Sequence, residues 1–394
     1  MTALSPASTL SQDVRTVKRL ELNYKRNARQ DHTALLDDAA GRFDYATCKD
    51  VAWNPERFSL LWGTPFWDQA SASERIKLNQ LYWVAYYADI ISAEIATIYF
   101  NQTSAAALYG LEDFRLVCDT LDLESSQERA HIHAFKTIGE AVEAELFGER
   151  VFTYSMRGPF AETVIYTDTS RVREKAKRML LRTFGVLSAQ NAFIGCQYFL
   201  IRGLRTLLGK IVQHQLSRHH TALPDPAASP IPSQVSFFHF QDESYHFNSS
   251  TIISHDVARS LPAPSRFERF VMNETVRGAQ KDLRPFTVLG DGLNWHGPRT
   301  FDVAHRVLTS KVFGLGAREA IEHLRQAYCV ESDGLQQAWD THVEALESYR
   351  KYVDGIDWLT PENREMRIAA DNSIGAVLAA NRDAFARFAA ERTA

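Results

Sequence analysis

The hydrophobic positions along this chain follow the spacing of helices. Ser71–Glu74 reads S-A-S-E, a capping-box pattern that predicts a largely apolar helix running through Asn101. Ser104–Cys118 predicts a short helix or turn, and Ser125–Ser126 predicts the cap of a helix that carries Gln127–Glu145. No segment alternates apolar and polar residues in the way of a half-buried strand, so the pattern predicts an all-α fold.

The next part of the chain predicts two further long helices with a loop between them. The first should begin at Asp168 or Ser170 and continue to Leu208 or beyond. Leu223–Ser233 contains four prolines, which a helix interior excludes, so this segment is expected to be a loop. A helix over about Gln234–Ile253 should follow it.

These elements suggest three parts of the chain. They are an N-terminal segment, 1–56, a central helical bundle, 57–260, and a helical extension, 261–394, which is expected to pack on the bundle. Prolines and glycines punctuate the start of the extension before helical patterns return, the last of them over Arg364–Ala390. An extension of this length is sufficient to shape a pocket or a contact in a homodimer.

Composition and charge are those of a globular protein. Of the 394 residues, 45% are hydrophobic and 23% are charged, and the net charge of -4 gives no electrostatic reason to expect a nucleic acid or anionic membrane partner. The apolar stretches 81–100 and 184–201 contain polar side chains, Asp89 and Glu94 among them, which lipid disfavours. The four cysteines are scattered without a CxxC pair, as expected for reduced thiols, and a cytoplasmic location is predicted.

Two strings of the form Glu-x-x-His carry the strongest chemical signal. They are Glu128-Arg129-Ala130-His131 and Glu243-Ser244-Tyr245-His246. Residues three apart on a helix share one face, so the Glu and the His of each string can bind the same metal ion. Two such strings, together with one Glu from each of two other helices, make up the ligand set of di-iron carboxylate bundles.

Two more residues extend this pattern. Glu94 lies in the middle of an otherwise apolar helix, where an ionised carboxylate needs a strong compensating charge such as a metal ion. His239 precedes Glu243 by four residues and His246 by seven, so all three side chains lie on one helical face. The sequence therefore predicts six metal ligands: Glu94, Glu128, His131, His239, Glu243 and His246.

The remaining bundle helix lacks the carboxylate that the pattern requires. No Asp or Glu occurs between Glu174 and Asp225, and Gln190 stands at the position where a ligand Glu is expected. An amide oxygen is neutral and a weaker donor than a carboxylate. The second metal site should therefore carry one negative charge less and have a coordination position that an added anion can fill.

With these spacings, the chain resembles the p-aminobenzoate N-oxygenase (AurF-like) family over about residues 57–255. The resemblance implies a ferritin-like four-helix bundle, here with extra N- and C-terminal helices, and two iron ions that use dioxygen as co-substrate to oxidise an amine. It also implies that Glu128 and Glu243 bridge the irons, that Glu94 and His131 complete one site, and that His239 and His246 serve the other. Asp242 resembles an acidic residue of the wider superfamily that orients a ligand histidine, and an exposed helical Asp is the alternative.

The departure at Gln190 leaves three interpretations of the chemistry open. The chain is an oxygenase with a poor ligand at Gln190, it holds only one metal tightly, or the vacant position receives chloride. The third would suit the cyanobacterial dimetal-carboxylate halogenases (CylC-like), which also resemble the N-oxygenases and act on carrier-bound fatty acyl chains. A non-enzymatic alternative is an iron-binding helical scaffold. The enzyme would need a small-molecule or acyl-carrier-bound substrate and an external electron donor, because no flavin or nicotinamide motif is visible.

Overall fold

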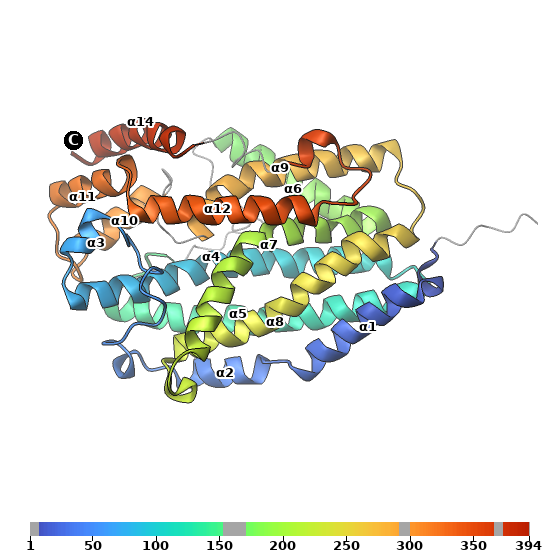
Figure 1. Cartoon of the computed structure of the whole chain (residues 1–394), viewed down its shortest axis with the longest axis horizontal. Coiled ribbons are helices and arrows are strands. Elements are labelled where there is room, and N and C mark those ends of the chain that lie inside the picture. Colours follow the sequence, from blue (N-terminus) through green and yellow to red (C-terminus); the bar gives the residue numbers. More distant parts are fainter. Residues whose placement is uncertain (1–7, 153–170, 291–299, 366–372, 394) are drawn as a thin grey trace, which may run out of the picture.

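The structure, a computed structural model, describes residues 8–152, 171–290, 300–365 and 373–393 (Figure 1). Within these ranges every regular element is a helix or a helical turn, which confirms the predicted all-α fold. Among these helices, none combines the length and the hydropathy that a membrane span requires.

Four long helices form the central bundle, as predicted for a ferritin-like fold. They are α4 (Ala72–Leu108), α5 (Arg115–Leu146), α7 (Ala192–Thr221) and α8 (Ile231–Thr251), and they pack as the pairs α4–α5, α4–α7, α7–α8 and α5–α8. The predicted capping box at the start of α4 is present, because the Ser71 hydroxyl and the Glu74 carboxylate each accept a backbone hydrogen bond from the other residue. Residues 78–87 of α4 are buried at every position, as expected for a helix segment enclosed by neighbours.

The prediction of one continuous third helix was wrong. Two helices, α6 (Arg171–Gln190) and α7, meet at Asn191, and the expected starts at Asp168 and Ser170 lie outside the described residues. Asn191 adopts an extended backbone conformation, and its side-chain oxygen accepts a hydrogen bond of 2.9 Å from the Ile194 N–H. The helical backbone is interrupted at Asn191, but the apolar residues continue on both sides of it. The sequence pattern therefore shows no boundary where α7 begins.

The boundaries of α5 and α8 also differ from the predicted ones. Ser125 lies inside α5 and bonds to the carbonyl of Leu121 instead of capping a helix. The predicted short element 104–118 is divided between the end of α4, the turn η3 (Glu112–Phe114) and the start of α5. α8 begins three residues earlier than predicted, because prolines fit the first helical turn.

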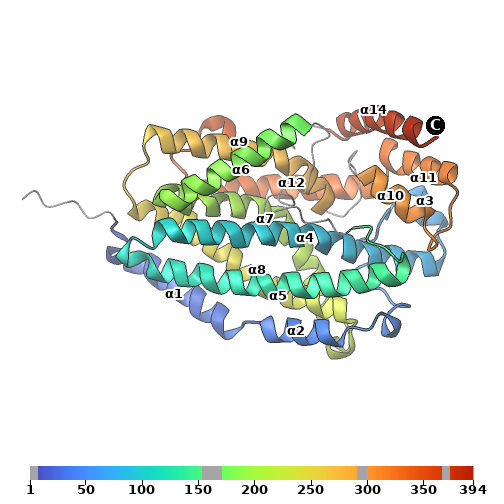
Figure 2. The same ribbon diagram turned by 180° about the vertical axis from the view of Figure 1, so that it is seen from behind.

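Two peripheral layers flank the bundle on opposite sides (Figures 1 and 2). The N-terminal helices α1 (Val14–Arg29) and α2 (Thr33–Arg42) pack on α5 and α8. On the other side α9 (Arg266–Gly290) and α12 (Asp333–Tyr352) pack on α7. The remaining α-helices are α3 (Pro65–Gln69), α10 (Phe301–Thr309), α11 (Ala317–Cys329) and α14 (Ile374–Thr393).

Short helical turns connect these elements. A π-turn, η5 (Ile252–Asp256), and a 3-10 turn, η6 (Val257–Ser260), extend α8. The other short turns are η1 (Leu10–Gln12), η2 (Tyr45–Thr47), η4 (Pro226–Ala228) and η8 (Pro361–Asn363). The final helix, predicted over Arg364–Ala390, begins at Ile374 in the described part of the chain.

Candidate metal centre

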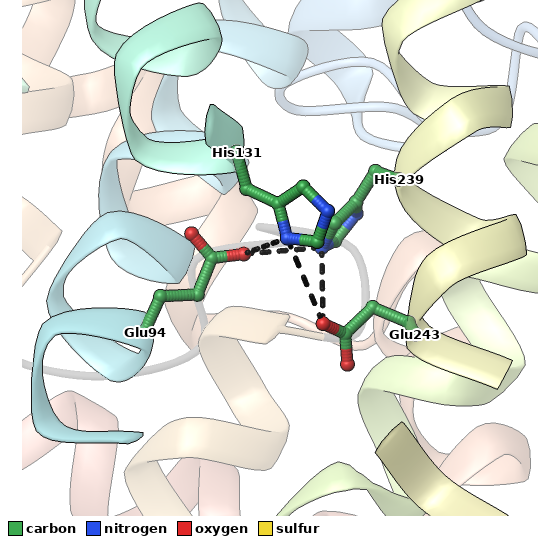
Figure 3. A group of neighbouring side chains, drawn as sticks. All are labelled: Glu94, His131, His239 and Glu243. Carbon is green, nitrogen blue, oxygen red and sulfur yellow. Dashed lines mark ion pairs between the residues drawn. The ribbon is translucent and has the colours of Figure 1, made fainter. Parts of the chain in front are cut away.

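The six predicted ligands lie together at the centre of the bundle. α4 supplies Glu94, α5 supplies Glu128 and His131, and α8 supplies His239, Glu243 and His246. Five of the side chains are buried and Glu243 is half-buried. Figure 3 shows four of them pointing toward one another from three helices. The Glu and the His of each Glu-x-x-His string therefore lie on one helix face and point into the same cluster, as the sequence predicted.

The first group of donor atoms comprises Glu94, His131, His239 and Glu243, one atom of each lying within 4.8 Å of the others. Glu94 Oε1 lies 3.1 Å from His239 Nε2 and 3.4 Å from His131 Nδ1. Glu243 Oε1 lies 3.8 Å from each of the same two nitrogens. The structure thus groups His239 with Glu94 and His131, whereas the resemblance paired His239 with His246.

The second group comprises Glu128, Glu243 and His246. His246 Nδ1 lies 3.3 Å from Glu128 Oε1 and 2.9 Å from Glu243 Oε1. The other carboxylate oxygen of Glu128, Oε2, faces His131 Nδ1 of the first group at 3.2 Å. Glu128 and Glu243 therefore each reach both groups, which is the position that a bridging carboxylate occupies.

The donor set fits metal ions better than it fits hydrogen bonding among its own members. Both oxygens of Glu94 and both ring nitrogens of His239 are buried and make no hydrogen bond among the described residues. Leaving such groups unsatisfied costs several kcal/mol (about 1–3 for each neutral group, more for a charge). Carboxylate oxygens and imidazole nitrogens converging on one point are a donor set that suits first-row metals such as iron.

The electrostatics of the metal-free cluster show how strongly its groups compete for protons. Burial raises the pKa of Glu94 to about 8. Burial would also raise the pKa of Glu128, but the adjacent His246 and His131 hold it well below its usual range. Burial and the nearby His131 lower the pKa of His239 to about 3, so that this imidazole is neutral. Without metal, some of these groups are therefore protonated and others are not, whereas metal binding requires all of them to be deprotonated.

The sequence model of the "Acyl halogenase CylC-like" family matches residues 15–180 and 160–389. The chain belongs to the CylC-like acyl halogenase family. It is therefore a non-haem dimetal enzyme, and the predicted resemblance to these relatives of the N-oxygenases is confirmed. No match was found among curated proteins or among solved structures.

In this CylC-like chain a hydrogen-bonded pair, Asp242 and His32, contacts the ring nitrogen of His131 that faces away from the cluster. Asp242 Oδ2 lies 3.3 Å from His131 Nε2, and Asp242 Oδ1 lies 2.6 Å from His32 Nδ1. Asp242 is fully buried, so of its two predicted interpretations the structure favours the orienting residue over the exposed one. His32 stands at the N-cap of α2 and stacks on Phe238, and nothing in the sequence pattern singled it out.

A second pair supports His246 in the same way. Gln127 Oε1 lies 2.9 Å from His246 Nε2, and Gln127 also exchanges two hydrogen bonds, of 2.9 and 2.8 Å, with the side chain of Asn27. Both amides are buried. With Nε2 engaged in this way, His131 and His246 each turn Nδ1 toward the carboxylates. Asn27 and Gln127 were missed because amides have no metal-binding spacing, although Asn27 falls on the same helical face as the buried Leu20 and Asn23 of α1.

α7, the fourth bundle helix, supplies no carboxylate, since its sequence contains neither Asp nor Glu. Its contribution near the cluster is Arg202, which is buried, pairs with Glu124 at 2.7 Å and donates to the carbonyl of His246 at 2.8 Å. Gln190 was wrongly placed at the metal site. It is the last residue of α6, and its side chain is exposed. Gln190 therefore does not belong to α7, the bundle helix beside the cluster, which begins at Ala192.

A cavity of about 680 Å³ opens from the cluster, a volume within the usual range of small-molecule sites. The candidate ligands Glu94, Glu128, His239, Glu243 and His246 form part of its wall. The rest of the wall comes mainly from apolar side chains of α4, α6, α7 and α9, among them Phe100, Phe184, Leu187, Ile201 and Val271. The candidate metal centre is thus accessible from a largely apolar chamber.

Metal binding should release protons and strengthen as the pH rises. The raised pKa of Glu94, together with the pKa values of His131 and His246 held above normal by their carboxylate partners, means that these groups carry protons near neutrality. Calorimetric titration with ferrous ion in buffers of different ionisation enthalpy should show net proton release at about pH 7 and a higher affinity at about pH 8 than at pH 6. Glu94→Gln should release fewer protons, and an affinity independent of pH would contradict the assignment.

Removing the support of His246 should weaken metal binding without unfolding the chain. Gln127→Leu leaves His246 Nε2 without an acceptor and should lower metal affinity about 10–100-fold, the range measured for such outer partners. Gln127→Glu keeps an acceptor oxygen in place and should retain most of the affinity. Competition with a chromophoric chelator measures the effect, and thermal unfolding of the metal-free variants controls for stability. Equal affinities for the Leu and Glu variants would exclude a positioning role.

Proposed function

We propose that this chain is a di-iron halogenase that replaces one C–H bond of an apolar acyl chain by C–Cl, with dioxygen and chloride as co-substrates. The observation that carries the proposal is the missing carboxylate on α7, whose cavity-facing surface bears Arg202, Arg205 and Lys210 instead. Membership of the CylC-like family supports the same reaction class.

In this proposal the two donor groups each hold one iron. Glu94, His131 and His239 would hold the first, His246 would hold the second, and Glu128 and Glu243 would contribute to both. When bound, the irons supply the reduction of dioxygen and the oxidising power needed to break an unactivated C–H bond. The chain's own residues hold the ligands in register, with Asp242 and Gln127 fixing the orientation of His131 and His246.

The charge of the site favours an added anion. Three glutamates offset three of the four positive charges of two ferrous ions, which leaves one excess positive charge in a largely apolar chamber. Arg202 is neutralised by Glu124. Among the described residues, Arg205 and Lys210 have no ion-pair partner within 4.0 Å. Because poorly solvated positive charge attracts anions strongly, chloride fits the position that an α7 carboxylate would otherwise take.

The reaction balances with a single external reductant. The substrate C–H bond and one chloride ion together give up two electrons and one proton as C–Cl forms. An external donor supplies two further electrons. Dioxygen accepts all four with four protons and leaves as two molecules of water. The chain must therefore meet an electron donor as well as its substrate.

An acyl chain suits the chamber better than an arylamine does. The polar groups that α7 adds to the wall are cationic or neutral, which favours an anionic co-substrate. The apolar wall excludes water and binds methylene groups through the hydrophobic effect. We propose a fatty acyl chain, presented as a thioester on a carrier, as the substrate.

Product analysis tests the proposal. The chain loaded with ferrous iron, supplied with a reductant, dioxygen, chloride and a dodecanoyl thioester, should give a product with the isotope pattern of one chlorine. Bromide in place of chloride should give the brominated chain. Oxygen incorporation from isotopically labelled dioxygen, with no halogen in the product, would make the chain an oxygenase instead.

The ligand assignment has its own control. Glu128→Ala with His246→Ala should lose most of the bound iron and all halogenation, because one bridging and one terminal ligand are removed. The matched pair Glu319→Ala with His323→Ala, outside the cluster on α11, should behave as the wild type does. Equal iron content in both double variants would refute the site.

Restoring a carboxylate on α7 should suppress the use of chloride. Thr206 faces Glu243 across a small cavity between α7 and α8. Thr206→Glu should retain iron more tightly and lower chlorination about tenfold or more, the change that ~1.4 kcal/mol of lost anion attraction produces. Thr206→Gln, of equal size but neutral, should be far less affected, and so should Gln190→Glu on the exposed end of α6. Chlorination unchanged in Thr206→Glu would contradict the charge argument.

A further inference from the structure

Three large apolar side chains stand at the boundary between the cavity and the protein surface. Leu180 of α6 and Phe267 and Phe270 of α9 all line the cavity, yet they are 66%, 57% and 64% exposed. A hydrogen bond of 2.8 Å between Asn191 and Glu268 joins the end of α6 to the start of α9. These three residues therefore form an apolar mouth through which the chamber meets solvent.

The apolar surface continues along α6 beyond the mouth. Met179 is 64% exposed and Val172 is 79% exposed, so α6 presents an apolar strip to the outside. Isolated exposed apolar residues are ordinary, but a contiguous group at a cavity entrance marks a contact site for another molecule. α6 lies on the side of the bundle opposite α1 and α2 (Figures 1 and 2).

Positive charge is concentrated beside this strip. The sequence of α6 contains six Arg or Lys residues and one Glu, although the chain as a whole carries a net charge of -4. Lys175 and Arg182 of α6 and Arg266 and Arg269 of α9 are exposed. An apolar patch bordered by cations is complementary to a partner with an apolar centre and an acidic rim.

We propose that the outer face of α6 and the first turns of α9 form the docking surface for an acidic acyl-carrier protein, which delivers its chain through the mouth at Leu180, Phe267 and Phe270. The inference rests on the proposed carrier-bound acyl substrate and adds the surface that the carrier contacts and the route by which the chain enters. Basic residues guide the carrier and fix its orientation, while the apolar mouth takes up the chain as it leaves the carrier. Burial of the exposed phenylalanines then contributes to affinity.

The distribution of charge favours a protein partner over a lipid surface. Glu274 is exposed and lines the cavity on the same face of α9 as Phe267 and Phe270. A bilayer that buried the two phenylalanines would bring this carboxylate against anionic headgroups. A protein partner can leave Glu274 and its ion pair with Arg277 at the edge of the contact.

A binding experiment with a charge-reversed pair tests the docking surface. The probe is an acyl-carrier protein charged with a dodecanoyl chain, bound to the iron-loaded enzyme without dioxygen, so that no turnover is needed. Lys175→Glu with Arg182→Glu should raise the Kd about tenfold or more, and added salt should weaken wild-type binding more than variant binding. The control, Lys311→Glu with Arg318→Glu, makes the same charge change on exposed residues near α11 and should change the Kd less than about twofold.

Two further measurements separate the outcomes. Dodecanoyl-pantetheine, which lacks the carrier, should be halogenated equally by both double variants, because it needs the chamber and not the docking surface. Vesicles containing phosphatidylglycerol should bind no more tightly to the wild type than to the charge-reversed variant.

Each failure points to a different error. Equal carrier affinity of the wild type and the charge-reversed variant, or equal weakening by the control pair, would overturn the docking surface. Vesicle binding that replaces carrier binding would assign the same face to a membrane and also overturn it. Carrier binding as expected, with no halogenation of either thioester, would instead leave the docking surface standing and refute the proposed reaction.

Discussion

The burial of three carboxylates and three imidazoles at one point inside an apolar bundle is the constraint on which the rest of this structure depends. Ionised groups lose hydration there, and burial is the largest cause of the raised pKa of Glu94, which lies at about 8. Buried polar groups persist only where partners are supplied, and both oxygens of Glu94 have no hydrogen bond among the described residues. A dimetal centre supplies the missing partner, so the bundle and the ions stabilise each other.

The same constraint explains the chemistry of α7. Where a carboxylate would complete a symmetric site, α7 has none, and its buried Arg202 is neutralised by Glu124 on α5 rather than by a ligand. The cluster therefore keeps excess positive charge once two divalent ions are bound. In a chamber walled by apolar side chains that charge would be poorly solvated, and on this ground we propose that an anion takes the place of the missing ligand.

Features of the site that depend on the spacing of residues along one helix could be predicted from the sequence, and features that depend on contacts between helices could not. The Glu-x-x-His spacing fixes which residues share a helix face, so all six candidate ligands were found, and the structure brings them together. Gln190 was misplaced because an apolar run shows no break where Asn191 caps a new helix. His32, Asn27 and Gln127 were missed because they act across tertiary contacts, which leave no spacing in the sequence.

Those tertiary contacts also make the N-terminal helices part of the metal centre. His32 of the α1–α2 connection bonds to Asp242 behind His131, and Asn27 of α1 bonds to Gln127 behind His246. Each histidine that faces Glu128 through Nδ1 is thereby connected to the N-terminal helices by hydrogen bonds. Any ligand that binds only the folded arrangement stabilises everything required for that arrangement. Metal binding and the packing of α1 and α2 on the bundle are therefore thermodynamically linked, so bound metal would oppose separation of the N-terminal segment from the site.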